Sequence, residues 1–461
     1  MDIQKFYGSL KGKTVAFCGI GGSNLPLIRI FAQHGAVVTA RDRRTEEKLG
    51  ETAGELKKLG VSLRLGEGYL EDLSEDIIFR TPGMKYYLPE LNAARERGAA
   101  VTSEMEVFFD LCPCKMIAVT GSDGKTTTTT ILSEMLKAAG KTVHLGGNIG
   151  TPLLPQIESI GPDDVAVVEL SSFQLISMRR SPDVAVVTNV TPNHLDMHKD
   201  MREYIGAKKN ILLHQNAFGR AVLNADNEIT AGFADDVRGE KLMFSRKHWC
   251  ARGAWLNEKN EIIMSLDGRD FPVMNASDIK IPGGHNIENY LAAVCALWGT
   301  VGTDIMAQTA RTFAGVEHRN EFVRELDGVK YYNDSIGTTP SRTMNGTLKL
   351  FDRRIILIAG GYDKKIPFDS FGPAVVDSVK TLVLMGATAD KIEASVKAAP
   401  QYREGSPKII RVGSLEQAVR VCRAEAVAGD IVSLSPACAS FDMFPNYETR
   451  GEEFKKLVER L

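Results

Sequence analysis

The chain has 461 residues, enough for about three domains of ordinary size. Its formal net charge is −2, with 56 basic and 58 acidic residues interspersed, which excludes the extended basic surface typical of nucleic-acid or membrane binding. The seven cysteines are odd in number and scattered, and no apolar run approaches a signal peptide or a membrane span, so we expect a cytoplasmic protein that acts on small molecules.

The first α/β pattern opens with a strand that enters a glycine turn, in the run Thr14–Gly22, followed by a helix. A second strand is expected from Ala36 to Arg41, and it ends at Asp42. Two spaced glycines with an acid about twenty residues later resemble a dinucleotide-binding fingerprint, but Asn24 stands at the third glycine position. The pattern alone leaves open whether NAD or the ribose, base or diphosphate of another nucleotide binds here.

A second α/β unit begins at Pro113, and its first strand leads into Thr120-Gly-Ser-Asp-Gly-Lys-Thr126. In this layout the glycines let backbone N–H groups turn towards phosphate oxygens, the following helix adds partial positive charge, and Lys125 can reach the β/γ-phosphates. Thr126 would supply a hydroxyl to Mg²⁺. Val119 replaces the first glycine of the common eight-residue form, so the sequence predicts a shortened phosphate loop and ATP chemistry.

Two further strands of this unit end in polar side chains. The run Val165–Val168 is followed by Glu169, and the run Val184–Val190 leads to His194. Ligands of open α/β sheets gather outside the carboxyl ends of the strands, so we expect both side chains to converge on phosphates held by Lys125. Taken singly, Glu169 also fits an acid at a helix N-terminus, and His194 also fits an ordinary loop histidine.

The third α/β pattern starts after residues 315–319. Four apolar strands, each followed by a polar or glycine turn, are expected at residues 329–332, 355–359, 381–385 and 431–434. They predict another parallel sheet. The chain as a whole is therefore expected to be an α/β protein with domains at residues 1–113, 114–317 and 318–461.

Six motifs, in this order, resemble those of the Mur ligases over nearly the whole chain. They are Thr120–Thr126, Glu169–Leu175, Asn189–Asp196, Gly284–Asn289, His318-Arg319 and Asn333–Ser335. The run Ser435–Phe444 followed by Arg450-Gly451 most resembles the branch that adds D-glutamate, and the Asp-Asn-Pro-Arg motif of the diaminopimelate- or lysine-adding branch does not occur. The resemblance implies a Rossmann-like first domain, a central P-loop-type ATPase domain with a mostly parallel sheet, and a Rossmann-like C-terminal domain.

The activity that this resemblance implies is ATP-dependent ligation of D-glutamate to UDP-N-acetylmuramoyl-L-alanine, a step of peptidoglycan precursor synthesis. The carboxylate would first take the γ-phosphoryl group of ATP, and the amine would then attack the acyl phosphate. Phosphoryl transfer depends mainly on positioning and charge neutralisation. ATP and two Mg²⁺ ions are the implied cofactors, and we expect a monomer.

The resemblance also implies the roles of individual residues. The catalytic set is Lys125, Glu169, His194 and Lys208, and the metal ligands are Thr126, Glu169, His194 and Lys208. Lys208 matches a carbamylated lysine whose CO₂ adduct would hold the second ion, although by itself it also fits a solvated lysine on a helix face. The other implied ATP contacts are Gly121, Ser122, Asp123, Gly124, Thr127, Asn286, Asn289, Arg319 and Asp334. The implied contacts to the UDP-linked substrate are Gly21, Asp42, Arg44, Gly83 and Asn148, and those to D-glutamate are Lys364, Ser440 and Tyr447.

Other classes of protein fit parts of the sequence. A nicotinamide-dependent oxidoreductase would use the first glycine turn, but it leaves the phosphate loop without a purpose. A P-loop switch or motor ATPase would use Lys125, yet such proteins usually carry aspartate where Glu169 stands. A folylpolyglutamate-synthase-like enzyme, or another Mur ligase with a different amino acid, would share the central loop, and the former would lack the α/β unit that precedes Lys115.

Overall fold

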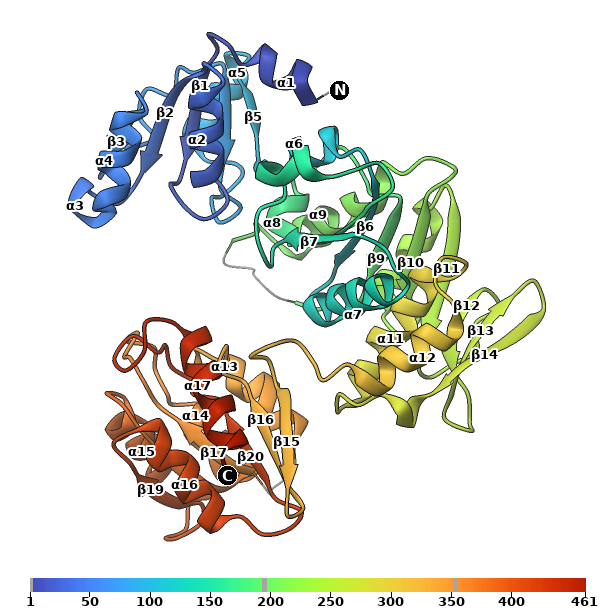
Figure 1. Ribbon diagram of the computed structural model, residues 1–461, viewed down its shortest axis with the longest axis vertical. Coiled ribbons are helices and arrows are strands. Elements are labelled where there is room, and N and C mark those ends of the chain that lie inside the picture. The colour runs from blue at the N-terminus through green and yellow to red at the C-terminus, as the bar shows by residue number, and fades with distance from the viewer. Residues whose placement is uncertain (1–2, 193–196, 352–354) are drawn as a thin grey trace. The chain divides into compact units, whose positions relative to one another are not determined.

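The computed structural model describes residues 3–192, 197–351 and 355–461 (Figure 1). The chain forms two compact units, one of Met1–Asp278 with Gly284–Arg311 and the other of Ile279–Gly283 with Thr312–Leu461. The first unit holds two sheets and the second holds one, which confirms the expected α/β class. The expected boundaries of three separate domains stay a prediction. No helix in the described ranges is both long enough and apolar enough to cross a membrane.

The first sheet has five parallel strands in the order β3-β2-β1-β4-β5. The two strands expected at the start of the chain are β1 and β2, and β2 includes Asp42 as its last residue. The strands are β1 (Thr14–Cys18), β2 (Val37–Asp42), β3 (Ser62–Leu65), β4 (Ile77–Arg80) and β5 (Ala100–Thr102). The helices are α1 (Ile3–Ser9), α2 (Leu25–Gln33), α3 (Glu46–Leu49), α4 (Glu51–Lys58), α5 (Pro89–Glu96) and α6 (Glu104–Leu111).

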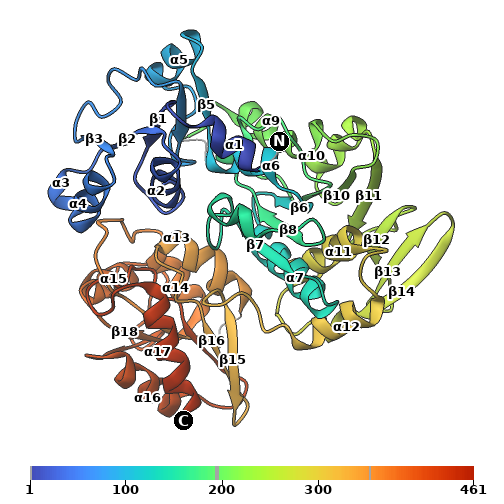
Figure 2. The ribbon, with the colours of Figure 1, turned by 45° about the horizontal axis from the view of Figure 1, so that its top comes forward.

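The central sheet has nine strands in the order β14-β13-β12-β11-β10-β9-β6-β8-β7. Strands β6 to β12 pair in parallel, whereas β13 and β14 are antiparallel, so the sheet is mostly parallel as expected. The three strands expected here are β6, β8 and β9, and β6 lies between the other two. Helices α7 and α11 lie side by side against this sheet (Figures 1 and 2).

The strands and helices of the central sheet region have the following bounds. The strands are β6 (Lys115–Thr120), β7 (Val143–Gly147), β8 (Val165–Glu169), β9 (Val184–Val187), β10 (Arg220–Asn224), β11 (Glu240–Ser245), β12 (Gly253–Leu256), β13 (Glu261–Leu266) and β14 (Arg269–Asn275). The helices are α7 (Lys125–Ala138), α8 (Ser172–Leu175), α9 (Met201–Leu213), α10 (Glu228–Ala231), α11 (Gly284–Leu297) and α12 (Thr303–Thr312). Three short turns of 3₁₀-helix are η1 (Leu154–Ser159), η2 (Gly232–Asp236) and η3 (Ala276–Asp278).

One hydrophobic core runs from the first sheet to the central sheet within the first unit. On the first sheet, the rings of Phe17 and Phe79 stack with centroids 4.8 Å apart, and Phe31 of α2 contacts both rings edge-on. Buried side chains of α6 and η1, including Phe108 and Leu154, continue the same core. Burial of this aromatic cluster therefore fixes α2 against the strands that carry the first glycine turn.

The sheet of the second unit has six strands in the order β15-β16-β20-β17-β18-β19. The four expected strands are β16, β17, β18 and β20, all parallel, and antiparallel β15 and parallel β19 are edge strands that the sequence patterns did not predict. The strands are β15 (Glu321–Leu326), β16 (Val329–Asn333), β17 (Ile355–Ala359), β18 (Val379–Leu384), β19 (Lys408–Arg411) and β20 (Ile431–Leu434). The helices are α13 (Pro340–Thr343), the π-helical turn η4 (Met344–Leu348), α14 (Phe371–Ser378), α15 (Ala389–Lys397), α16 (Leu415–Glu425) and α17 (Tyr447–Glu459).

Candidate active site

The loop between β6 and α7 has the geometry of an anion-binding turn. Gly121 and Gly124 have φ angles of +154° and +79°. A Cβ atom at Gly121 would lie 1.9 Å from Thr188 Oγ1, and one at Gly124 would lie 2.5 Å from Asn289 Oδ1, so both positions require glycine. Helix α7 begins at Lys125, so its first N–H groups face the loop, where they can bind phosphate oxygens. Lys125 Nζ donates to the carbonyl oxygen of Gly121 at 2.9 Å.

Two asparagines of α11 lie beside this loop. Asn289 Oδ1 accepts a hydrogen bond from Thr128 Oγ1 at 3.1 Å, and Asn289 Nδ2 donates to Asn286 Oδ1 at 2.9 Å. Both asparagines are buried. The two residues predicted to contact ATP therefore lie beside the phosphate loop, and the Asn289 side chain also holds α11 against α7.

Ser122 and Tyr204 join the phosphate loop to α9. The Oγ atom of Ser122 lies 2.9 Å from the hydroxyl oxygen of Tyr204 and donates to the carbonyl oxygen of Thr191 at 2.9 Å. Tyr204 was not predicted as a site residue. Its spacing of four from Lys208 is the signal that could have found it, because residues i and i+4 share one face of a helix.

Lys208 is buried, with 2% of its surface exposed, so it is not a solvated lysine on a helix face. Its Nζ atom donates to the carbonyl oxygen of Gly121 at 2.6 Å and lies 4.8 Å from the centre of the Tyr204 ring. Burial, and then the charge of Lys125, lower the pKa of Lys208 to about 7, although Asp123 and Glu169 act in the opposite direction. Near neutral pH a large fraction of this amine is therefore uncharged and nucleophilic.

Glu169, the last residue of β8, carries the group best suited to a metal ion. It is 1% exposed, and its Oε1 atom accepts a hydrogen bond from Asn148 Nδ2 at 2.8 Å. Within the described ranges its buried Oε2 atom has no hydrogen-bond partner. A buried carboxylate oxygen without a donor is costly, and Mg²⁺ prefers oxygen ligands of this kind, so Glu169 fits a magnesium ion. Thr126, at the start of α7, adds a buried hydroxyl.

His194, the other expected metal ligand, belongs to residues 193–196 and lies outside the described residues. A different histidine, His198, is described. Its Nε2 atom lies 2.9 Å from Ser172 Oγ, and its Nδ1 atom lies 3.3 Å from Glu203 Oε2. His198 therefore connects α8, which follows Glu169, to α9, which carries Lys208.

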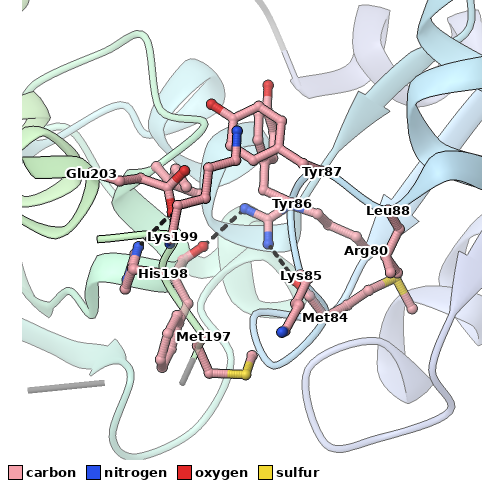
Figure 3. A pocket seen from close by; sticks show the side chains of 12 residues that line it. Arg80, Met84, Lys85, Tyr86, Tyr87, Leu88, Met197, His198, Lys199 and Glu203 are labelled. Atoms are coloured by element: carbon pink, nitrogen blue, oxygen red, sulfur yellow. Dashed lines mark hydrogen bonds and ion pairs between the residues drawn. The ribbon is translucent and has the colours of Figure 1, made fainter. Parts of the chain in front are cut away.

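A hollow of about 260 Å³ lies between the segment after β4 and the start of α9 (Figure 3). Arg80, at the end of β4, is 1% exposed and donates to the carbonyl oxygen of Phe173 at 2.9 Å and to Ser177 Oγ at 2.8 Å. Beside it, the ammonium of Lys199 lies 4.0 Å from the centre of the Tyr87 ring. The buried guanidinium thus fastens the first sheet to the segment that follows Glu169.

Four of the five residues expected to contact the UDP-linked substrate lie at the carboxyl edge of the first sheet, whereas Asn148 follows β7 of the central sheet. Asp42 accepts from the backbone N–H of Ile20 at 2.7 Å and from the guanidinium of Arg44 at 2.8 Å. Burial acts to raise the pKa of Asp42, but the hydrogen bonds from Arg44 and Ile20 outweigh it and lower the pKa. Gly21 follows Ile20 directly, and Gly83 lies in the turn after the neighbouring strand β4.

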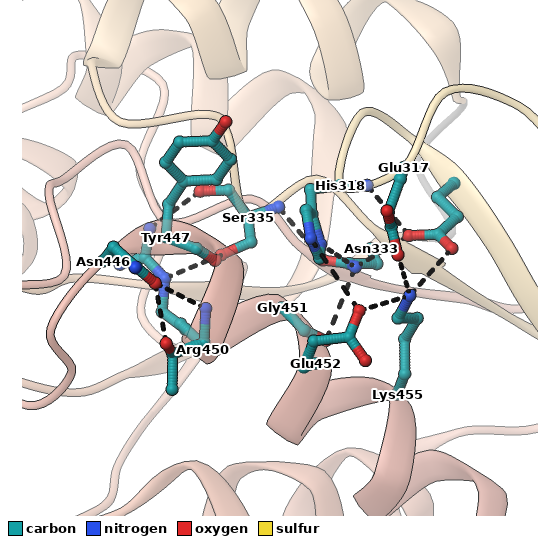
Figure 4. Close-up of polar contacts among 12 residues, drawn as sticks. Glu317, His318, Asn333, Ser335, Asn446, Tyr447, Arg450, Gly451, Glu452 and Lys455 are labelled. Atoms are coloured by element: carbon teal, nitrogen blue, oxygen red, sulfur yellow. Dashed lines mark hydrogen bonds and ion pairs between the residues drawn. The ribbon is translucent and has the colours of Figure 1, made fainter. Parts of the chain in front are cut away.

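In the second unit, the residues on both sides of Arg319 make polar contacts, and Figure 4 shows His318 beside Asn333. His318 has a φ angle of +60°, rare for a residue with a side chain, and its Nδ1 atom lies 3.0 Å from Asn333 Nδ2. Asp334 accepts from the N–H of Asn320 at 3.2 Å, and burial raises its pKa. Asp334, an expected ATP contact, thus holds the backbone N–H of the residue that follows Arg319, the other expected contact in this segment.

Glu317, His318 and Glu452 offer ligand atoms within 4.8 Å of one another, but a cation is already present among them. The ammonium of Lys455 lies 2.7 Å from carboxylate oxygens of both Glu317 and Glu452, and 3.3 Å from Glu321 (Figure 4). These carboxylates more than offset its burial and raise the pKa of Lys455. The cluster is therefore an internal ion-pair network rather than a metal centre.

Two of the residues expected to bind D-glutamate, Lys364 and Ser440, lie in the segments that follow β17 and β20. Lys364 donates to the carbonyl oxygen of Thr338 at 3.3 Å, whereas Ser440 is buried. Tyr447 is the first residue of α17. Arg450, which had no predicted role, is 1% exposed and donates to carbonyl oxygens of Ser335 and Cys438 at 2.8 and 3.2 Å, so it ties these turns together.

Comparison with protein families and known proteins gives consistent matches. Residues 119–297 match the model of the Mur ligase middle domain, and residues 318–438 match the model of the Mur ligase glutamate ligase domain. The chain is 52% identical to the UDP-N-acetylmuramoylalanine–D-glutamate ligase of Acetivibrio thermocellus, covering 99% of this chain and 98% of that protein. It is 51% identical to the ligase of the same name from Clostridium kluyveri, with coverage of 99% and 98%, and 48% identical to that of Clostridium botulinum, with coverage of 100% and 99%.

Several solved structures have a fold similar to that of this chain. A UDP-N-acetylmuramate-alanine ligase from Thermotoga maritima matches with a TM-score of 0.56 at 18% identity, covering 97% of this chain and 99% of that one. A pseudomurein peptide ligase type C from Methanothermus fervidus matches with a TM-score of 0.53 at 19% identity, with coverage of 97% and 100%. At such identity the likeness supports the three-sheet architecture and nothing finer.

Proposed function

The chain belongs to the Mur ligase family, and we propose that it uses ATP to join D-glutamate to UDP-N-acetylmuramoyl-L-alanine. The observation that carries the proposal is 48–52% identity to D-glutamate ligases over essentially the whole chain, first sheet included. A Mur or folylpolyglutamate-synthase-type ligase with a different amino acid is the alternative considered from sequence, and no observation favours it. The reaction places the protein in cytoplasmic peptidoglycan precursor synthesis.

The phosphate loop supports a mechanism through an acyl phosphate. The N–H groups at the start of α7 would bind the phosphates of ATP, and Lys125 would leave the carbonyl oxygen of Gly121 to follow the γ-phosphoryl group. The substrate carboxylate would attack the γ-phosphorus and ADP would leave. The amine of D-glutamate would then attack the acyl carbon and expel phosphate, forming the amide. Asn286, Asn289, Arg319 and Asp334 would contribute the remaining contacts to ATP.

Two Mg²⁺ sites are part of the proposal. Thr126 and Glu169 would hold one ion, with Asn148 orienting the Glu169 carboxylate, and His194 with carbamylated Lys208 would hold the other. When bound, these ions neutralise charge on the phosphate oxygens. The amine of Lys208 would attack CO₂, forming an N–C bond and releasing a proton to solvent. Its burial and its pKa of about 7 support this step, because only the free amine reacts.

Substrate recognition would be shared between two sheet edges. Gly21, Asp42, Arg44 and Gly83 would contact the UDP group, and Asn148 would lie near the muramoyl end. Lys364 and the Ser440 hydroxyl would bind the carboxylates of D-glutamate beside Tyr447. The protein is expected to act as a monomer.

The proposal is tested by measuring phosphate release in the presence of ATP, Mg²⁺ and UDP-N-acetylmuramoyl-L-alanine, with one amino acid of a panel added at a time. D-glutamate should support turnover far above L-alanine, L-lysine and L-glutamate. Release that needs no amino acid would indicate a plain ATPase, and equal turnover with L-lysine would overturn the assigned specificity. NADH fluorescence should not change on titration with the protein, because the first glycine turn is assigned to UDP rather than to NAD.

A further inference from the structure

Cys112 and Cys114 place two sulfur atoms 3.6 Å apart at the junction between α6 and β6. Only Pro113 separates them, and the proline ring fixes one backbone torsion of this turn. The Sγ atom of Cys112 also lies 3.7 Å from the carbonyl oxygen of Cys114, so its side chain folds back over the turn. The two thiols therefore meet within a short and constrained segment.

Access to the pair differs from access to every other thiol in the chain. All seven cysteines lie in the described ranges, and Cys112 is the one that is not buried. It lines an open hollow of about 610 Å³, whose wall includes Ile3, Glu158 and Arg180. Cys114, at 7% exposure, lies behind it. A small reagent in solvent can therefore reach Cys112 more readily than Cys114.

The pKa values of the two paired thiols also differ from those of the buried cysteines. Burial raises the pKa of Cys18 to about 12 and those of Cys250 and Cys438 to about 11, which keeps these thiols protonated and unreactive. Within the pair, the hydrogen bond from the Cys112 thiol lowers the pKa of Cys114, and the same bond raises the pKa of Cys112. Loss of one proton therefore leaves a thiolate whose sulfur lies in hydrogen-bond contact with the remaining thiol.

We propose that Cys112 and Cys114 form a redox-active dithiol that a small hydroperoxide converts into an intramolecular disulfide. In the singly ionised pair, the proton shared between the two sulfurs moves to Cys114, and the Cys112 thiolate attacks the O–O bond. This gives Cys112 sulfenic acid and an alkoxide or hydroxide, which takes the proton from the Cys114 thiol. The Cys114 thiolate then attacks the sulfenic sulfur and expels hydroxide, which is protonated by solvent. Two thiols and one hydroperoxide give one disulfide, one alcohol or water, and one further water.

The geometry favours this product over other outcomes. A disulfide bond is about 2.0 Å long, so the two sulfurs need to approach by only about 1.6 Å from their separation of 3.6 Å. Because the resolving thiol is already in contact, the sulfenic acid would be captured before it oxidises further. The new bond would join the end of α6 to the start of β6, the strand that leads to the phosphate loop. The inference does not depend on the proposed function.

The test uses the full chain, reduced and then treated with a slight excess of hydrogen peroxide. The expected result is a loss of two of the seven free thiols, a mass decrease of about 2 Da in the peptide that contains both cysteines, and full recovery with dithiothreitol. Cys112→Ser should lose the mass decrease, and so should Cys114→Ser. Cys250→Ser, a change at a buried and unpaired position, should keep it.

A second measurement needs no substitution. Iodoacetamide applied to the native, reduced protein should alkylate Cys112 alone, and the alkylated protein should no longer form the disulfide. Disulfide-linked dimers, labelling spread over several cysteines, or a mass increase on Cys112 without any mass decrease would overturn the proposal.

Discussion

The Nζ atom of Lys208 donates a hydrogen bond to the carbonyl oxygen of Gly121 at 2.6 Å, so an amine of α9 lies against the phosphate loop. This contact joins two parts of the chain that are 87 residues apart. Burial of the amine, and then the charge of Lys125 in the same loop, lower the pKa of Lys208. Both effects support the proposed reaction of Lys208 with CO₂, which needs the neutral amine.

We expect Lys208→Ala to fold, to bind ATP and to lose turnover by about a hundredfold or more, because the anion at the second metal site would be missing. Acetate or formate should restore part of the activity by occupying the vacated position. In the parent enzyme, ¹³C-labelled bicarbonate should give a carbamate NMR signal that the variant lacks. Turnover near the parent value would exclude the carbamate.

Two further variants separate charge from chemistry at this position. Lys208→Arg keeps a positive charge but cannot be carbamylated, so it should be as inactive as Lys208→Ala. Lys209→Ala is the matched control, because Lys209 pairs with Asp236 instead of the phosphate loop. It should keep nearly full turnover. An active Lys208→Arg enzyme would show that only a cation is needed.

Lys125→Ala should cut turnover by about two orders of magnitude or more, since Lys125 is the charge placed to follow the migrating phosphoryl group. The fold should survive, because this side chain makes hydrogen bonds to loop carbonyls and contributes little to the core. Lys141→Ala, an exposed lysine after α7, serves as the control in the same phosphate-release assay. Equal rates in the two variants would reject the assignment of the phosphate loop.

The elements that could be predicted from the sequence are those marked by a pattern of neighbouring residues. The phosphate loop, the strands ending at Glu169 and Asp42, and four strands of the last sheet were all visible as apolar runs followed by glycine or polar turns. Strands β15 and β19 were not visible, because charged residues interrupt their short apolar runs, and their edge positions are defined only by the assembled sheet.

Contacts over long sequence separations were the part that could not be predicted. The burial of Lys208 depends on Gly121, 87 residues away, so only the family resemblance pointed to it. The hydrogen bond from Asn148 to Glu169 and the role of Arg450 likewise depend on how loops of different strands meet. Hydrophobic periodicity reports which face of an element is buried, but not which polar groups then face each other.

Lys455→Met should destabilise the second unit by about 1–3 kcal/mol, because it leaves Glu317, Glu321 and Glu452 close together without their counter-ion. Lys456→Met, an exposed neighbour, should have little effect. The comparison is thermal melting followed by circular dichroism, with hydrogen exchange at the His318 amide, which donates to Glu321, as the local probe. Unchanged exchange in Lys455→Met would mean that the network does not hold this segment.

All three tryptophans, at positions 249, 255 and 298, belong to the first unit, so their fluorescence reports on its unfolding alone. They allow a test of Glu104, a buried acid of α6 that accepts hydrogen bonds from the N–H groups of Leu153 and Leu154 at 3.0 and 2.8 Å. Burial raises its pKa from 4.5 to about 6 despite these two bonds.

The sign of the pH dependence follows from this shift. Between pH 4.5 and 6 the folded protein holds the Glu104 proton more tightly than the unfolded chain, so the contribution of Glu104 to stability is present below this window and is lost as the pH rises through it. Glu104→Gln keeps an acceptor oxygen for both N–H groups and has no charge to bury. Its free energy of unfolding relative to the parent should therefore rise by up to about 2 kcal/mol from pH 4.5 to pH 7. Urea unfolding followed by tryptophan fluorescence measures this difference. Glu96→Gln, a change at an exposed position, is the control. If the difference stays level or falls from pH 4.5 to pH 7, burial does not hold the carboxyl of Glu104 in its protonated form.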